Sequence, residues 1–491
     1  MRGARSKLLH VLAAATASAA AALALAGPAM GYSIWPLAGT GTQCGTPPSC
    51  GDGGAATSAL LSFPEGVAVG PAGDVYVADW GDNEVRKLSV SGSITPVAGG
   101  GTSCSSPPAC GDRGPATDAQ LSFPDGVAVD QAGNVYIADT GDNEVRKVSP
   151  GGTITRFAGT GAVCASPPAC GDGGAATAAQ LRNPFGLAVD RSGDVYIADA
   201  GDNEVRKVTP AGKISRIAGT GKACSKPPAC GDDGPATGGQ LNFPAGVAVD
   251  QAGNVYVADD GDNEVRKVAA GGTISRIAGT GAACSAPACG DSGPALSATL
   301  GAPDGVAVDQ HANVYVADDL DNEIRMISSA GTISRIAGTG TGCVVAASCG
   351  NGGSASSAQL NYPDALAVDP SGNVYVDDTF DQQLRWLSVA PGSSLRTASA
   401  TVRLLAFQPT VARASVTVRY ALSSGAPVTL SVTPAGRKPT VVGRATGRAG
   451  WSTLTWNRRI DGVPAARGRY TLTVTTTVGG RSATSRVGVK L

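Results

Sequence analysis

Short apolar segments separated by turn residues recur along most of the chain. Between positions 126 and 157, such segments occupy residues 126–130, 135–139, 144–148 and 153–157, and Gly-, Asn- or Pro-containing turns separate them. β-Branched and aromatic residues are frequent in these segments, as is typical of short antiparallel strands joined by tight turns. There is no sustained helical periodicity, so a helical solenoid is disfavoured. The pattern predicts four strands per unit.

The same unit occurs six times. The Ala-Gly pair that opens it begins at positions 38, 98, 158, 218, 278 and 337, so the spacing is 60 residues, with a last spacing of 59. Six units of four strands predict an all-β, six-bladed β-propeller over residues 32–389. Repeat 6 ends at Val389 without a fourth strand, whereas residues 32–37 supply one ahead of repeat 1. We therefore expect the mature N-terminal strand to complete the sixth blade and close the ring.

The pattern changes after residues 390–400, whose composition is that of a linker. In residues 401–491 we predict a series of alternating strands at Ala414–Leu422, Val428–Val432, Trp451–Trp456, Arg469–Val478 and Thr484–Leu491. Several short strands in a segment of this length favour an Ig-like β-sandwich.

The first 31 residues have the features of a signal peptide. Arg2, Arg5 and Lys7 precede the apolar run Leu8–Ala26, and small residues follow, so cleavage is expected after Gly31 or Ala26. The alternative is an uncleaved membrane anchor. We expect a secreted or extracytoplasmic protein, at the cell surface or in the periplasm, with no membrane insertion once the signal is removed.

The twelve cysteines support export because they form one pair per repeat. An even count at near-constant spacing in an exported chain predicts disulfides, with pairing inside each repeat as the simplest connectivity. A metal site would need about four converging ligands, and each pair offers two. The pairs are Cys44/Cys50, Cys104/Cys110, Cys164/Cys170, Cys224/Cys230, Cys284/Cys289 and Cys343/Cys349.

The formal net charge of −1 hides an asymmetry between the two parts. Residues 32–395 hold 38 acidic and 20 basic residues, a net charge of −18, whereas residues 396–491 hold 15 basic residues and Asp461 alone, a net charge of +14. The basic part is expected to bind acidic envelope polymers or to dock onto the acidic propeller. We expect no sequence-specific nucleic-acid binding, because no groove-reading motif is present.

The repeat core P-x-G-V-A-V-D-x-x-G-N-V-Y-V-A-D-x-G-[DN]-N-x-[VI]-R-K resembles the NHL repeat, which implies a six-bladed propeller. The extension with GDGGPAT and AQL is similar to secreted bacterial NHL proteins and to the NHL domain of teneurins. Glutamate stands where the family often has a basic residue, which argues against an RNA-binding role; the positions are Glu84, Glu144, Glu204, Glu264 and Glu323.

The C-terminal part, residues 401–491, resembles a different family. Residues 447–456, Asp461-Gly462 and Gly468-Arg-Tyr470 resemble the FlgD-like Ig-type domain, although Asn457 replaces the usual Asp after Trp456. Such a domain implies an accessory module.

Three departures from the repeat consensus mark a candidate binding site. The turn between the second and third strands carries Trp80 in repeat 1, Leu320 in repeat 5 and Phe380 in repeat 6. These repeats are neighbours in a closed ring, on the face that bears the long stapled connections. Exposed apolar clusters mark interaction sites, so we predict a partner-binding patch here. The alternative is that these side chains pack under neighbouring loops or cover the closure seam.

Two aspartates per turn lie on the same face, among them Asp79, Asp82, Asp378 and Asp381. One interpretation is that each caps its own turn by accepting backbone N–H bonds. The other is a carboxylate ring for Ca²⁺ or a cationic partner. Because the D-x-D-x-D-G pattern is absent, no cofactor or metal is assigned beyond this weak calcium signal.

The mature sequence offers few candidate catalytic residues. Its one histidine, His311, falls in a predicted surface turn, and no G-x-S-x-G motif is present. We therefore predict no enzyme but a non-catalytic binding or scaffold protein that engages a protein or an envelope component. The alternatives are a calcium-dependent propeller hydrolase or lactonase and a purely structural surface protein. No feature of the sequence indicates the oligomeric state.

Overall fold

The computed structural model describes residues 32–389 apart from 46, 48–49, 105–109, 169, 228–229, 285–288 and 344–348. Beyond them it describes 404–411, 416–422, 426–434, 438–447, 450–457, 459–460, 463–466, 469–478 and 481–490. The predicted signal peptide, the linker at 390–400 and the motif residues Asp461, Gly462 and Gly468 lie outside these residues. In the described part, no helix has the length and apolar character needed to cross a membrane.

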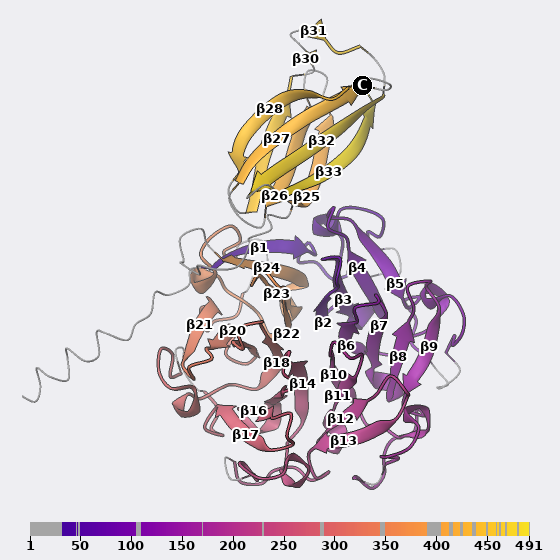
Figure 1. Cartoon of the computed structure of the whole chain (residues 1–491), viewed down its shortest axis with the longest axis vertical. Helices are drawn as coiled ribbons and strands as arrows, with labels where there is room; N and C mark the ends of the chain where they lie inside the picture. Colours follow the sequence, from indigo (N-terminus) through magenta and orange to yellow (C-terminus); the bar gives the residue numbers. More distant parts are fainter. Residues whose placement is uncertain are drawn as a thin grey trace, which may run out of the picture.

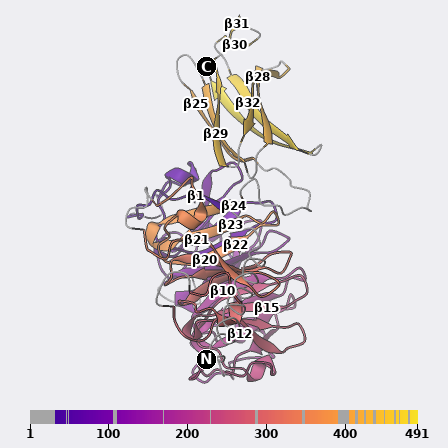
Figure 2. The same cartoon turned by 90° about the vertical axis from the view of Figure 1, so that its left-hand side faces the viewer.

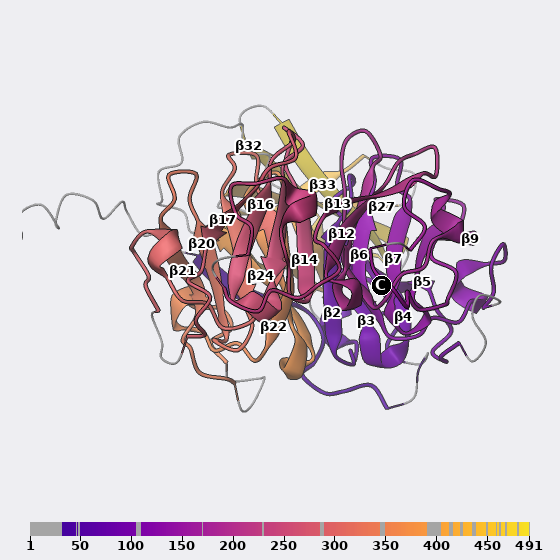
Figure 3. The same cartoon turned by 90° about the horizontal axis from the view of Figure 1, so that it is seen from below.

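Residues 32–389 form antiparallel four-stranded sheets arranged in a ring, and the described residues contain six of them (Figure 1). The first strand of each sheet, which we call the inner strand, contacts the inner strands of both neighbouring sheets, and β22 contacts β2 to close the circle. The inner strands gather in the middle of the ring (Figure 1), which Figure 3 shows from its edge. They are β2 (Pro64–Val69), β6 (Pro124–Val129), β10 (Pro184–Val189), β14 (Pro244–Val249), β18 (Pro303–Val308) and β22 (Pro363–Val368).

The second and third strands carry the repeated V-Y-V-A-D and E-V-R-K-V sequences. The second strands are β3 (Val75–Asp79), β7 (Val135–Asp139), β11 (Val195–Asp199), β15 (Val255–Asp259), β19 (Val314–Asp318) and β23 (Val374–Asp378). The third strands are β4 (Glu84–Leu88), β8 (Glu144–Val148), β12 (Glu204–Val208), β16 (Glu264–Val268), β20 (Glu323–Ile327) and β24 (Gln383–Val389).

The outermost strand of the last sheet comes from the N-terminal end of the described chain. β1 (Tyr32–Ala38) pairs antiparallel with β24, with Ile34 opposite Leu387, as expected from the strand that repeat 6 lacks (Figure 1). β1 thus takes the outermost place in its sheet, which the fourth strand takes in each of the other five propeller sheets of the described residues. The other outer strands are β5 (Ile94–Ala98), β9 (Ile154–Ala158), β13 (Ile214–Ala218), β17 (Ile274–Ala278) and β21 (Ile333–Gly338).

Short 3-10 helices occupy the turns and connections. Those between second and third strands are η2 (Trp80–Asp82), η4 (Thr140–Asp142), η6 (Ala200–Asp202), η8 (Asp260–Asp262) and η12 (Thr379–Asp381). Those in the long connections are η1 (Ala56–Ser58), η3 (Ala116–Asp118), η5 (Ala176–Ala178), η7 (Ala236–Gly238), η9 (Ala295–Ser297) and η11 (Ala355–Ser357).

The hydrophobic core lies between adjacent sheets. We number the sheets from first to sixth by their inner strands, from β2 to β22. Ala78 and Val85 of the first sheet, for example, pack with Val127 and Ile137 of the second and with Leu121 of the connection before it, and all five are buried. In five of the six inner strands a glycine follows the second residue, and in β22 the residue is Ala365. The glycine allows a close approach, since a Cβ at Gly126 would overlap the carbonyl oxygen of Phe185 on the next inner strand. This close approach explains the glycine of the P-x-G motif.

Every connection between sheets contains one disulfide, formed inside its own repeat as predicted, between the pairs Cys44–Cys50, Cys104–Cys110, Cys164–Cys170, Cys224–Cys230, Cys284–Cys289 and Cys343–Cys349. No cysteine of the described residues is free.

The C-terminal part forms two antiparallel sheets that contact each other (Figure 2). Trp456 and Tyr470 pack in their core with ring centroids 5.7 Å apart. One sheet contains β25 (Leu404–Val411), β26 (Val416–Leu422) and β29 (Gly450–Trp456); the other contains β28 (Thr440–Gly447), β27 (Ala426–Pro434), β32 (Arg469–Val478) and β33 (Arg481–Lys490). A short ribbon pairs β30 (Arg459–Ile460) with β31 (Val463–Pro464).

Candidate functional site

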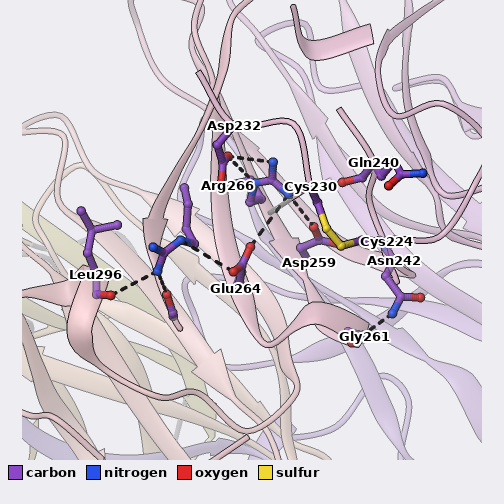
Figure 4. A network of polar contacts seen from close by, with 12 residues as sticks. Cys224, Cys230, Asp232, Gln240, Asn242, Asp259, Gly261, Glu264, Arg266 and Leu296 are labelled. Carbon is purple, nitrogen blue, oxygen red and sulfur yellow. Dashed lines mark hydrogen bonds and ion pairs between the residues drawn. A yellow bond between two sulfur atoms is a disulfide. The ribbon is translucent and has the colours of Figure 1, made fainter. Parts of the chain in front are cut away.

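The aspartate that ends each second strand is a structural residue. Asp79 is 0% exposed; its Oδ1 accepts the backbone N–H of Ser62 at 2.6 Å and its Oδ2 accepts a bond from Arg86 at 3.2 Å. Arg86, also fully buried, bonds Asp52 of the stapled connection at 2.8 Å. The arginine therefore joins the strand to the disulfide-bearing connection. Figure 4 shows the same network around Arg266.

These contacts bear on the hypothesis that the paired aspartates form a carboxylate ring for Ca²⁺ or a cationic partner. Asp79 and Asp378 are 0% exposed and paired with arginine, while Asp82 and Asp381 are 1% and 4% exposed. Burial raises the pKa of both Asp82 and Asp381 to about 7. The turn-capping interpretation is also incomplete, because Asp79 binds a backbone N–H in the preceding connection and not in its own turn.

The apolar departures from the repeat come together at the surface. Trp80 packs against Phe63 and Phe123, with ring centroids 6.3 and 4.6 Å away, and Phe380 packs against Phe63 and Tyr362 at 5.6 and 4.7 Å. These five rings form a continuous surface, the aromatic arc, over the sixth, first and second sheets. The exposed fractions are 53% for Phe380, 41% for Phe123 and 38% for Tyr362, so the arc does not pack under loops.

The backbone presents the arc in a defined way. Phe63, Phe123 and Tyr362 precede inner strands and have positive φ angles of 51° to 52°. Each backbone N–H donates to a side-chain amide of the preceding sheet: Phe123 to Asn83 Oδ1 at 2.9 Å, Phe63 to Gln382 Oε1 at 2.7 Å and Tyr362 to Asn322 Oδ1 at 3.0 Å. Asn322 ends the turn that carries Leu320, whose side chain is 56% exposed beside the arc's end. Leu320 and Phe380, the two predicted apolar residues outside repeat 1, are thus exposed.

The ring encloses a cavity of about 350 Å³ on its axis, which we call the axial cavity. Trp80 lines it, so the arc reaches its wall. The second residue of every inner strand also lines it, and this position varies from repeat to repeat; the residues are Glu65, Asp125, Phe185, Ala245, Asp304 and Asp364. The wall is therefore acidic on the fifth, sixth, first and second sheets and apolar on the third and fourth.

The acidic wall has no cationic partner within the described residues, whose Lys and Arg ion pairs involve other carboxylates. Glu65 hydrogen-bonds Asp125, and burial together with that neighbour raises the pKa of Glu65 to about 12. Burial raises the pKa of Asp364 to about 7, and burial plus the nearby Asp364 raise that of Asp319 to about 9. Like charges in a desolvated site retain protons in this way.

The sequence did not single out these cavity residues. The sequence does contain one signal for them, because the residue after the proline of each inner strand differs between repeats that are otherwise nearly identical. His311 lies in an exposed turn, where its N–H donates to Asp309 Oδ1 at 2.8 Å.

The fold and this surface define a β-propeller with a candidate ligand-binding face. The model of the Teneurin NHL domain matches residues 29–109, 94–169, 153–229, 209–287 and 274–341, and the chain therefore belongs to that family. Teneurin-1 of Homo sapiens is 29% identical over 358 residues, and Teneurin-3 of Danio rerio is 30% identical over 360 residues. These matches cover 68% and 69% of this chain but 12% of each relative, so the chain corresponds to a small part of those proteins.

Among solved structures, a structural genomics protein of unknown function from Bacteroides thetaiotaomicron is similar with a TM-score of 0.50. Its sequence identity is 17%, and the match covers 72% of this chain and 75% of that one. This likeness supports the fold alone.

Proposed function

We propose that the protein is an exported, non-catalytic binding module: a six-bladed NHL propeller that binds a protein or envelope component, joined to an FlgD-like Ig-type accessory domain. The aromatic arc is the observation that carries this proposal. Five contacting rings, of which Phe123, Tyr362 and Phe380 are more than a third exposed, form an apolar surface of the kind that marks interaction sites. Aromatic residues are also enriched among the residues that dominate binding energy.

Export is supported by the six disulfides, since such bonds persist in oxidising compartments. The cell surface and the periplasm both satisfy this condition. A protein is the partner class that best matches an aromatic surface, and the basic C-terminal domain is proposed to contribute salt-sensitive contacts to acidic polymers.

The calcium-dependent hydrolase is kept as a second candidate on one observation, the carboxylates of the axial cavity, because Ca²⁺ takes oxygen ligands. Calcium-dependent turnover of lactones would favour it over the binding module.

The test is retention of a partner from envelope and secreted fractions by the full-length protein, at low and moderate salt. The double variant Phe123→Ala/Phe380→Ala is expected to lose the partner, whereas Phe243→Ala is expected to retain it. Phe243 is the matched control: it is 37% exposed at the position equivalent to Phe123, but on the fourth sheet and outside the arc. Equal retention by both variants, or retention that depends only on salt, would refute the proposal.

A further inference from the structure

The axial cavity gathers carboxyl groups that pair with no cationic side chain of the described residues. Asp304 and Asp364 face it from the fifth and sixth sheets, and Glu65 and Asp125 from the first and second. Within the described residues, the arginine of each third strand is used elsewhere, because it pairs with the aspartate that ends the second strand. A cation that enters the cavity would therefore meet several carboxylates with no competing positive group.

A further carboxylate stands behind this wall. Asp377 replaces the alanine found at the same place in the second strands of the other repeats, it is 0% exposed, and neither of its carboxylate oxygens has a hydrogen-bond partner. Burial raises the pKa of Asp377, and among the neighbouring charges Asp364 of the cavity adds most to that rise. An unpartnered buried carboxylate is costly, and a cation nearby offsets that cost.

The shape and chemistry of the cavity discriminate between cations. A cavity of about 350 Å³ is much larger than one ion, and Phe185, Leu187 and Ala245 make its other wall apolar. Ca²⁺ takes about 6–8 oxygen ligands from around its whole sphere, whereas the side chains that line the cavity from the third and fourth sheets supply none. A lysine or arginine side chain matches both walls, because its methylene stem packs on apolar surface while its head binds carboxylates.

The mouth of the cavity favours the same type of ligand. Trp80 lines the cavity and is also part of the aromatic arc. A cationic head group passing an indole face gains a cation–π interaction. A protein seated on the arc thus has a route for one side chain into the acidic site.

We propose that the partner bound by the aromatic arc is a protein segment that inserts a lysine or arginine side chain into the axial cavity, against Asp304, Asp364 and the Glu65–Asp125 pair. This inference rests on the proposed function and adds to it the chemistry of the partner's anchor residue. Neutral or acidic side chains of similar size are disfavoured, since only a cation stabilises the ionised form of the cavity carboxylates.

Calorimetric titration of the full-length protein with the capped peptide Leu-Arg-Leu tests this inference. The matched ligand carries citrulline in place of arginine and so keeps the size while losing the charge. We expect the arginine peptide to bind about tenfold more tightly or better. We also expect it to release protons from the cavity carboxylates at neutral pH, measured as a dependence of the heat on the buffer.

The double variant Asp304→Asn/Asp364→Asn is expected to abolish the preference for arginine and to reduce proton release. Its fold is expected to persist because the change removes buried like charges. Asp118→Asn, which removes an exposed carboxylate in a long connection, is the control and is expected to change neither quantity.

Equal affinities for the two peptides, including no binding of either, would overturn the inference. The inference would also be overturned if Ca²⁺, added as CaCl₂, bound in a way that requires Asp304 and Asp364 and the arginine peptide did not compete with it. If a partner depends on Phe123 and Phe380 but is bound equally well by the Asp304→Asn/Asp364→Asn variant, the proposed function stands and this inference fails.

Discussion

The buried arginine of each third strand is expected to be a major source of stability, and Arg206 provides the sharpest test. Its guanidinium bonds Asp199 at 3.3 Å and Asp172 at 2.9 Å, and it also donates to the carbonyl oxygens of Gln180 at 2.7 Å and Cys170 at 3.2 Å. Arg206→Met removes these bonds and leaves Asp199, which is 0% exposed, without its counter-charge. Breaking a buried pair from one side costs about 3–5 kcal/mol.

Urea unfolding followed by circular dichroism measures this cost. Arg206→Met/Asp199→Asn is expected to be less destabilised than Arg206→Met alone, because no unpaired buried charge remains. Lys207→Met on the same strand is the control: Lys207 pairs with Asp194 but is 28% exposed, and such pairs contribute at most about 1 kcal/mol. A loss below about 1 kcal/mol in Arg206→Met, or a double variant no more stable than the single one, would refute this reasoning.

Two further predictions concern pH and ring closure. Asp364 and Asp319 have folded-state pKa values raised from 3.8 to about 7 and about 9, so the folded chain holds protons that the unfolded chain has released. The stability that these two groups contribute is therefore highest below pH 3.8 and is lost as pH rises towards those values. The melting temperature should fall across this range, and Asp319→Asn/Asp364→Asn should flatten the fall. An unchanged dependence of melting temperature on pH in this variant would contradict the raised pKa values. Ile34→Ala should cost about 2–5 kcal/mol, as should Ile154→Ala at the equivalent position, since both side chains are 0% exposed. Only Ile34→Ala should abolish hydrogen-exchange protection of β1, because no tight turn joins β1 to its partner β24. Equal protection of β1 in the two variants would argue against closure of the ring by this strand.

The parts of the fold that repeat were predictable from the sequence. A period of 60 residues with four apolar segments determines the strands of each sheet, and the missing last strand of repeat 6 identifies residues 32–37 as its replacement. The pairing of Ile34 with Leu387 agrees with that expectation. Disulfide pairing was predicted from the even number of cysteines, the expected export and the near-constant spacing, since the two cysteines of a repeat are five or six residues apart.

Other features depend on contacts that periodicity does not encode. Arg86 lies 34 residues from Asp52 and 7 from Asp79, so its burial between them follows from how the connection folds over the strand. β28 was not predicted because Thr440–Gly447 contains glycine and arginine and lacks a regular alternation. β25 was also missed, as it lies directly after the linker.

Some residues of the candidate site were likewise predictable from the sequence, and others were not. Trp80, Leu320 and Phe380 were identifiable because they interrupt a near-identical repeat on one face. Phe63, Phe123 and Tyr362 complete the arc through positive-φ positions that occur ahead of an inner strand, where a sequence pattern indicates only a loop. The axial carboxylates come from four separate repeats and meet only when the ring closes.

Site-specific photo-cross-linking of the full-length protein tests the central claim most directly. A benzophenone amino acid placed at Phe380 is expected to cross-link one discrete partner from envelope or secreted fractions, and the same group at Phe243 is not. Cross-linking of the same partner with equal yield from both positions, or from Phe243 alone, would contradict binding at the aromatic arc.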